Sequence, residues 1–314
     1  MLWYIVRRLL YAVPILVGVS LLTFLIFYIA VSPQQLARRN LSAKNPTPQQ
    51  IHEWLAEHGY DRPMPVQFAH HLEELFLLRF GKSDTQGAEP IWESIRQRWK
   101  PSFMLTSMIF VAELITAICF ALVVAYFRGT YVDYWGTLLC VLLMSIVYMV
   151  YIIAGQYLFG KILKYFPLAG WGRGLEAWKF VLLPMLVGVI VSLGSSVRLY
   201  RTFMLDEINQ DYVRTARAKG VSERAILFVH VLKNAAIPIL TTSVQLIPAL
   251  FLGNLLLEQF FDIPGLGNFL VDAIESQDFA VVRAMVFLGT LVTIVGYILT
   301  DISYALVDPR VRLE

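Results

Sequence analysis

Only a few residue groups in this 314-residue sequence have the types and spacing that chemistry requires. Gly81, Lys82 and Ser83 look like the end of a phosphate-binding loop, but that motif requires glycine where Phe76 stands. The sequence contains no other nucleotide-binding signature, no serine elbow and no paired-histidine zinc pattern. We therefore expect no enzymatic activity and no cofactor bound by this chain. Energy for any transport would come from a partner or from an ion gradient.

Four histidines lie near one another and are candidate transition-metal ligands: His52, His58, His70 and His71. Adjacent residues such as His70 and His71 project from different faces of a helix, and no cysteine lies near them. Surface histidines are therefore favoured over a metal site, and we predict no metal.

Glu113 is the single charged residue in the middle of a long apolar segment. A charge there costs about 2.5–3.5 kcal/mol on insertion scales, whereas roughly thirteen Leu, Ile, Phe and Val residues contribute about 4–8 kcal/mol, so the segment still inserts into a membrane. Glu113 is a candidate for a translocation path, because such residues face a bundle interior or a water-filled path. The alternative is a hydrogen-bonded structural carboxyl.

An acidic segment near the C-terminus forms a second candidate site. It carries five acidic residues before the next basic residue: Glu258, Asp262, Asp272, Glu275 and Asp278. A sharp turn is predicted from Asp262 through Pro264 and Gly265 to Gly267, since proline fixes one dihedral and glycine frees others. We take Glu258 and these turn residues as an outer-loop signature. Its charges either attract a cationic ligand or partner, or only keep the loop in water.

Residues 205–239 form the one long polar interruption in the second half of the chain. Acidic residues precede basic residues over 205–219, which favours a single helix there. Gly220 supplies the left-handed residue that ends such a helix, and Ser222 can cap a second one. A charged pair of helices between apolar segments is a candidate docking surface, and the alternative is a solvated connection.

The elements that position these residues are predicted to be membrane helices. The chain is 57% hydrophobic and 16% charged, with a mean hydropathy of +0.62, and its apolar runs are long and unalternating, as in a helical integral membrane protein. A net charge of +3 is too small to imply a nucleic-acid partner. Six apolar segments are long enough to span a bilayer: about 9–31, 103–127, 135–159, 180–199, 237–257 and 282–307.

The distribution of basic residues predicts the orientation. Twelve Lys and Arg residues lie in short loops on the side of the termini and five on the other side. Loop 161–179 is the exception to this distribution, because it lies on the other side and carries four of those five residues. The positive-inside rule then places both termini in the cytoplasm. We predict three parts: residues 1–31 with the first span, an extracytoplasmic segment 32–102 of short amphipathic helices, and a five-helix core 103–314 that includes a cytoplasmic loop at 200–236.

Segment 32–102 is predicted to be ordered. Thr47 and Pro48 begin a helix in which Gln50 completes a capping box, and Gly59 ends it. Further apolar stripes follow the break at Pro63 and favour helices on the membrane surface or against the ends of the spans.

Five stretches resemble the first of the two permease subunits of peptide- and nickel-type binding-protein-dependent ABC importers, and the resemblance covers nearly the whole chain. They are RRLLYAVPILVGVSLLTF, HGYDRPMPVQF with FGKS, QDYVRTARAKGVSERAILFVHVLKNAAIPIL, EQFFDIPGLG and DISYALVDPR. The resemblance implies a type I ABC importer bundle of six transmembrane helices in a bacterial inner membrane. Implied partners are a second, similar permease, two ATPase subunits that use ATP and Mg, and an extracytoplasmic solute-binding protein.

In this family a short coupling helix in the cytoplasmic loop sits in a groove of the ATPase. Arg214, Thr215, Ala216 and Gly220 occupy the places of the Glu, Ala, Ala and Gly of the general importer motif, so the acidic residue is replaced here. Small Ala216 and Ala218 permit close approach of the ATPase. The implied coupling element is Tyr212, Val213, Arg214, Thr215, Ala216, Arg217, Ala218, Lys219, Gly220 and Val221.

Two further departures from the family pattern concern the spans. Val147 follows Ser145 and Ile146 where members often carry Ser-Ile-Pro, and Pro238 lies further from Gly220 than the usual proline. The hypothesis is a permease subunit that imports di- or oligopeptides. The alternatives are the same architecture importing nickel chelates or oligosaccharides, a gradient-driven secondary transporter and, as a distant third, a membrane-embedded enzyme.

Overall fold

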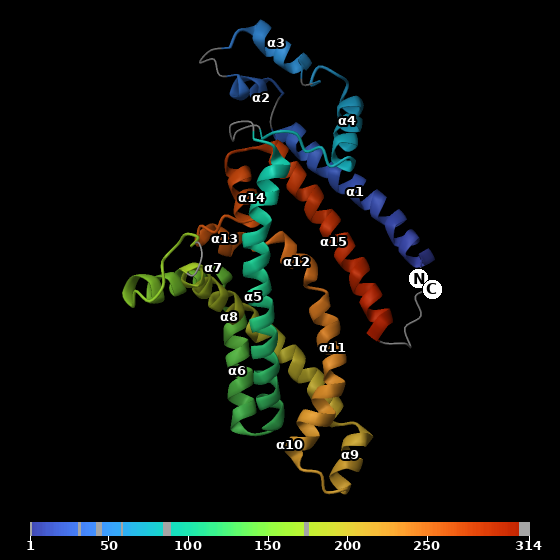
Figure 1. Ribbon diagram of the computed structural model, residues 1–314, viewed down its shortest axis with the longest axis vertical. Coiled ribbons are helices and arrows are strands. Elements are labelled where there is room, and N and C mark those ends of the chain that lie inside the picture. The colour runs from blue at the N-terminus through green and yellow to red at the C-terminus, as the bar shows by residue number, and fades with distance from the viewer. Residues whose placement is uncertain are drawn as a thin grey trace. The chain divides into compact units, whose positions relative to one another are not determined.

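The structure is a computed structural model that describes residues 2–30, 33–41, 46–57, 59–83, 89–172 and 176–307 (Figure 1). Over these ranges its regular structure is helical, apart from one isolated bridge between Lys82 and Pro90. Within the described residues, five helices or helical runs are long and apolar enough to cross a membrane, and a bent helix pair would make a sixth. The predicted all-helical membrane class is confirmed. The orientation of the termini and the division at residues 31 and 102 stay predictions, and His58 lies outside the described residues.

The chain divides into two compact units, each described by itself: residues 1–99 with 269–298, and residues 100–268 with 299–312. Helices α5, α14 and α15 each contribute to both units. The helices of the first unit are α1 (Leu2–Ala30), α2 (Pro33–Asn40), α3 (Pro48–Glu57), α4 (Met64–Phe76), the start of α5 (Ile91–Tyr126), the end of α14 (Leu266–Glu275) and most of α15 (Phe279–Val307).

Helix α3 has the predicted ends. The Thr47 N–H donates to Gln50 Oε1 at 2.9 Å, and the Gln50 N–H donates to Thr47 Oγ1 at 3.4 Å, which is the predicted capping box. Gly59 has φ +72° and ends the helix, with the Tyr60 N–H donating to Leu55 O at 2.8 Å.

Helix α4 packs against the spans of the first unit. Phe24 of α1 contacts Phe68 of α4 with ring centroids 5.4 Å apart. Leu16, Leu75 and Phe287 form a buried cluster that joins α1, α4 and α15. Of the two arrangements predicted for these amphipathic helices, α4 therefore adopts packing against the spans.

The second unit contains the remaining helices and the rest of α5. They are α6 (Tyr131–Ser145), α7 (Tyr148–Gly155), the π-helix η1 (Gln156–Ile162), α8 (Ala177–Ile208), α9 (Asp211–Ala218), α10 (Glu223–Ala225), the π-helix η3 (Ile226–Val231), α11 (Leu232–Val244), α12 (Ile247–Leu252) and α13 (Leu255–Phe260). Helices α6 and α8 lie side by side, and α11 also packs on α8 (Figure 1).

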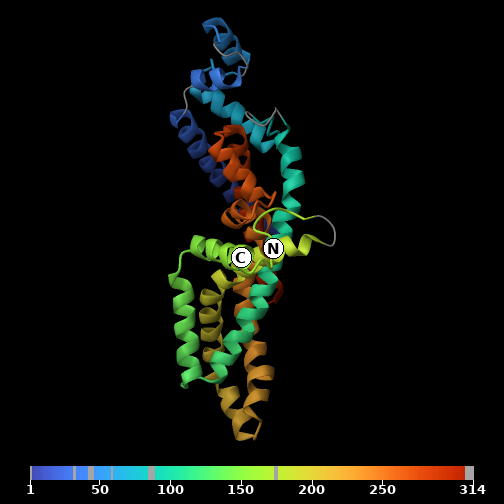
Figure 2. The same cartoon turned by 90° about the vertical axis from the view of Figure 1, so that its left-hand side faces the viewer.

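The third predicted span, residues 135–159, is not one straight segment. Helix α6 ends at Ser145, and α7 with η1 continues at an angle of 93° (Figure 2). Ile146 and Val147 are extended, with φ/ψ of −92°/131° and −65°/139°. Because a helix cannot continue through two extended residues, the chain turns here without proline.

The fifth predicted span, residues 237–257, lies within a longer helical run over Glu223–Phe260. This run contains breaks between α11, α12 and α13. Gly253 has φ +78°, a conformation that favours glycine, and the Asn254 side chain accepts a hydrogen bond from the Leu257 N–H at 3.1 Å to start α13.

Candidate functional site

Helix α9 has two faces of opposite character. The exposed residues Asp211, Arg214, Thr215 and Ala218 recur at helical spacing and form one stripe, which we call the outward face. Val213 and Ala216 face the other way and are 0% and 9% exposed.

The start of the predicted helix over residues 205–219 is wrong. Residues 205–208 are the last turn of α8, and α9 is a new helix that follows Asn209 and Gln210. Gln210 has φ/ψ of −72°/154° and so separates the two helices. Asp206 and Glu207 precede Asp211 by five and four positions, and this spacing could have suggested two helix starts, because acidic residues suit the first turn of a helix.

The end of α9 agrees with the prediction. Gly220 has φ +78°, its N–H donates to Arg217 O at 2.9 Å, and the Val221 N–H donates to Ala216 O at 3.2 Å. These two bonds form a Schellman motif. Ser222 Oγ then accepts from the Ala225 N–H at 3.4 Å and caps α10, so the two predicted caps are confirmed.

Side-chain bonds fix α9 to its neighbours. The Tyr212 hydroxyl donates to Glu207 Oε2 at 2.7 Å, which joins α9 to the end of α8. Arg217 Nε and Nη2 donate to the two carboxylate oxygens of Glu223 at 2.6 and 3.1 Å, which joins α9 to α10. Burial raises the pKa of Tyr212, so its hydroxyl keeps the proton that it donates.

The inner face of α9 belongs to the core of the second unit. Val213 and Ala216 pack in one buried cluster with Ala121 of α5, Met204 of α8 and Ile226 of η3. Ala216 is therefore used in internal packing, which corrects its predicted role as a small residue that a partner approaches. Ala218 and Thr215 are the small residues on the exposed side. A force on the outward face would pass directly into the packing of α5 and α8.

Further bonds brace the helices beside this loop. Arg201 of α8 makes a two-pronged ion pair with Asp133 of α6, with Nε–Oδ1 and Nη2–Oδ2 distances of 2.9 and 2.8 Å. Arg128 Nη1 donates to Asn209 Oδ1 at 3.3 Å, beside the break between α8 and α9. The sequence did not predict these contacts, although Arg201 and Asp133 carry opposite charges at the ends of predicted spans.

The turn after α13 is built around a buried carboxylate. Glu258 is 0% exposed, and Oε2 accepts from the N–H groups of Gly267 and Asn268 at 2.6 and 3.2 Å, while Oε1 accepts from the Asn254 N–H at 3.1 Å. Ser102 Oγ of α5 accepts from the Leu266 N–H at 2.7 Å in the same place. Glu258 thus holds both ends of the loop from α13 to α14.

The predicted turn is present, but Glu258 does not serve as a solvated loop charge. Asp262 is exposed and has φ +50°, and the Gly265 N–H donates to Ile263 O at 2.7 Å. A Cβ at Gly265 would collide with the Glu258 carboxylate and with Ser102 Oγ. Glycine is therefore needed at this position because the chain passes close to the carboxylate.

In the first unit Asp278 is also 0% exposed and accepts a hydrogen bond from the Ser83 hydroxyl. Ser83 belongs to the FGKS stretch, and its bond to Asp278 gives this serine a structural role. Of the five acidic residues predicted to attract a cationic ligand or partner, or to keep the loop in water, Glu258 and Asp278 do neither, because both are buried.

Glu113 is 4% exposed in α5, and its Oε1 has no hydrogen-bond partner among the described residues. Ser196 of α8 lies near the carboxyl group. This buried position fits both a residue of a translocation path and a structural carboxyl group. A role of Glu113 in translocation stays a prediction.

The described residues contain no group of three or more His, Cys, Asp or Glu side chains placed to hold a metal. His70 is exposed and its Nδ1 lies 3.6 Å from Glu74 Oε1, whereas His71 is buried. The two adjacent histidines therefore do lie on different faces of α4.

Two known protein families match most of this sequence. Residues 117–313 match the family described as binding-protein-dependent transport system inner membrane component, and residues 1–100 match the N-terminal family of the same systems. The chain belongs to this family. It is therefore a membrane permease component of an ABC transporter.

Several relatives align over the whole permease. A putative peptide transport system permease protein of Brucella abortus (strain 2308) is 32% identical over 99% of both chains. The oligopeptide transport system permease protein AppB of Bacillus subtilis is 30% identical over 98% of this chain and 99% of its own. The dipeptide transport system permease protein DppB of Escherichia coli K12 is 28% identical over 99% of both.

Proposed function

We propose that this permease imports di- or oligopeptides across a bacterial inner membrane, with energy from ATPase subunits that bind the outward face of α9. The observation that carries the proposal is full-length similarity to several proteins named as peptide, oligopeptide or dipeptide permeases. The match covers 98–99% of this chain and so includes both units.

The geometry of α9 supports a coupling role for Tyr212–Val221. One face is exposed and carries charged and small side chains, while the other packs on α5 and α8. Two-pronged bonding between Arg217 and Glu223 makes α9 and α10 one stiff element. When the ATPases close, this element would move as a lever and shift the spans that pack on it.

The proposed assembly has one solute-binding protein outside the membrane, a second similar permease and two ATPase subunits. Both termini and the α9–α10 loop lie in the cytoplasm, as the basic residues of the short loops predict. ATP and Mg are used by the ATPase subunits, and this chain binds no cofactor of its own.

Reconstitution tests this proposal. The permease, its partner permease, the ATPases and the binding protein are placed in proteoliposomes, and uptake of a labelled dipeptide and a labelled pentapeptide is measured with and without ATP. We expect ATP-dependent uptake that unlabelled peptide reduces and that a nickel chelate or an oligosaccharide leaves unchanged. Uptake by the purified chain alone without ATP, or competition only by a non-peptide solute, would contradict the proposal.

A further inference from the structure

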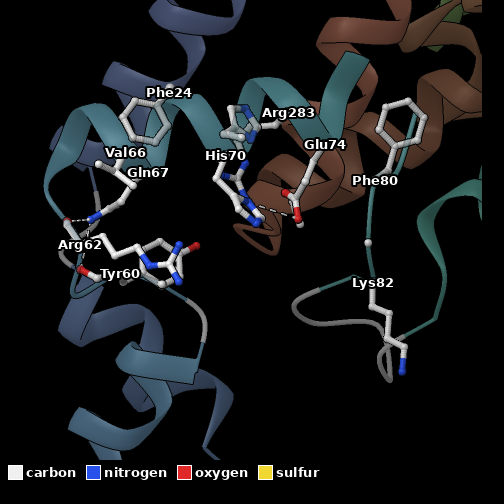
Figure 3. A pocket seen from close by; sticks show the side chains of 14 residues that line it. Phe24, Tyr60, Arg62, Val66, Gln67, His70, Glu74, Phe80, Lys82 and Arg283 are labelled. Atoms are coloured by element: carbon white, nitrogen blue, oxygen red, sulfur yellow. Dashed lines mark hydrogen bonds and ion pairs between the residues drawn. The ribbon is translucent and has the colours of Figure 1, made fainter. Parts of the chain in front are cut away.

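A cavity of about 380 Å³ lies in the first unit between α1, α4, α15 and the chain before and after α4 (Figure 3). Its lining combines the rings of Phe24 and Tyr60 with the guanidinium groups of Arg62 and Arg283. These four residues come from three segments that are distant in sequence, so no local motif marks the cavity.

One buried group in the lining lacks a partner. His71 is 8% exposed, and its Nε2 is buried with no hydrogen-bond partner among the described residues. Burial, together with the positive charge of Arg283, lowers the pKa of His71 to about 3, so the ring is neutral at neutral pH. Because a buried polar atom without a partner is costly, a ligand that supplies one would bind with advantage here.

The charge of the cavity is predominantly positive. Among the described lining residues Glu74 is the one acidic residue, and it lies beside His70. Arg62 and Arg283 make no ion pair in the part of the chain that the structure describes; Arg283 Nε donates to the Phe279 carbonyl at 3.2 Å. Two guanidinium forks without a carboxylate partner suit the oxygens of a phosphate group.

The cavity lies close to the ends of two membrane-spanning helices. Phe24 precedes the last residue of α1, Ala30, by six positions, and Arg283 follows the first residue of α15, Phe279, by four. At about 1.5 Å per residue, each is within about 10 Å of the end of its span. This is the level at which phospholipid headgroups meet the hydrocarbon layer.

We propose that this cavity binds an anionic phospholipid through its phosphate group. Arg62 and Arg283 donate to phosphate oxygens, His71 Nε2 contacts the polar headgroup, and Phe24 contacts the first carbons of the acyl chains. Phosphatidylglycerol fits this chemistry, because its headgroup adds hydroxyl groups to one negative charge. Phosphatidylethanolamine adds an ammonium group, which the two guanidinium groups repel.

Native mass spectrometry of the full-length permease in mild detergent, titrated with each lipid, tests the proposal. We expect phosphatidylglycerol to bind at least about tenfold more tightly than phosphatidylethanolamine, and Arg62→Gln or Arg283→Gln to weaken its binding by about tenfold, the scale of one charge-assisted hydrogen bond. Lys82→Gln is the matched control: it removes one positive charge from the same lining, but Figure 3 shows Lys82 directed away from the other labelled side chains. The affinity of Lys82→Gln for phosphatidylglycerol should stay within about twofold of that of the unaltered chain.

Equal binding of the two lipids by the unaltered chain, a result that depends on no variant, would overturn the proposal. An equally large loss in Lys82→Gln would overturn the assignment to the two arginines. Displacement of bound phosphatidylglycerol by millimolar inorganic phosphate would show a site for a small free anion instead of a lipid.

Discussion

Glu258 provides the most quantitative mutational prediction. Its carboxylate accepts three backbone N–H groups, two at Oε2 and one at Oε1. In Glu258→Ala all three donors lose their acceptor in a buried site. In Glu258→Gln the amide oxygen can replace Oε2, whereas the amide nitrogen must face the Asn254 N–H.

The number of lost acceptors predicts both the order of stability of the two variants and the size of each loss. A buried donor without an acceptor costs about 1–3 kcal/mol, so we expect Glu258→Gln to lower the free energy of unfolding by about 1–3 kcal/mol. The three lost acceptors in Glu258→Ala cost more, about 3–5 kcal/mol after water has entered the site, which is also the typical cost of removing one partner from a buried charged pair. Glu275→Ala is the control, because this exposed carboxylate at the end of α14 should change stability by less than about 0.5 kcal/mol.

Thermal unfolding of the three variants in one detergent measures the order, and amide hydrogen exchange at Gly267 and Asn268 measures the local effect. We expect the alanine variant to be the least stable, the glutamine variant to be intermediate, and both amides to exchange faster in each Glu258 variant. If both Glu258 variants unfold at the temperature of Glu275→Ala, the carboxylate does not hold the turn and the reasoning is refuted.

Three further predictions concern separate parts of the chain. Val147 already has the φ of proline and Ile146 is extended, so Val147→Pro should preserve transport and raise the free energy of unfolding by about 0.4–1 kcal/mol, measured by thermal unfolding. Gly220→Ala should destabilise the protein by about 1–2 kcal/mol through the left-handed conformation alone, since no atom of the described residues lies within 4 Å of the added Cβ. Gly81→Ala is its control, with the same expected loss of stability but unchanged coupling. His71 has a pKa of about 3 when packed and about 6.5 when exposed, so the stability of α4 packing is complete above pH 6.5 and falls by about 1.4 kcal/mol per pH unit below it. Hydrogen exchange of α4 in phospholipid-free detergent at pH 7 and pH 5 measures this loss, which should be absent in His71→Gln.

The features that the sequence predicted correctly depend on neighbours within a few positions. The capping box of Thr47 and Gln50, the bond from Gly220 to Arg217 and the cap at Ser222 each join residues only three positions apart. Hydrophobic runs of span length are equally local, and they predicted the helical membrane class.

The errors have a different origin. The burial of Glu258 depends on a turn that includes Leu266 and on Ser102, which lies 164 positions before Leu266 in the sequence. The inner position of Ala216 depends on α5 and α8. A one-dimensional pattern shows that a carboxylate or a small residue is present, but which surface covers it is decided by tertiary packing.

The bend at Ile146–Val147 lies between these cases. The sequence departs from Ser-Ile-Pro at this position, and the structure has a 93° bend there with valine. A proline would favour the bend, but the extended conformation of two residues is sufficient to produce it.

Ala218→Trp tests whether ATPase subunits bind the outward face of α9. Ala218 is exposed, so a tryptophan there should leave the fold intact while obstructing a closely fitting partner. Ala69→Trp, at an exposed alanine of α4, is the matched control. In proteoliposomes containing the assembled importer, we expect Ala218→Trp to reduce both ATPase co-purification and ATP-driven peptide uptake by at least about tenfold, as expected for obstruction at the centre of an interface, with Ala69→Trp unchanged. If Ala218→Trp and Ala69→Trp show equal uptake and equal co-purification, the ATPase subunits do not bind the outward face of α9.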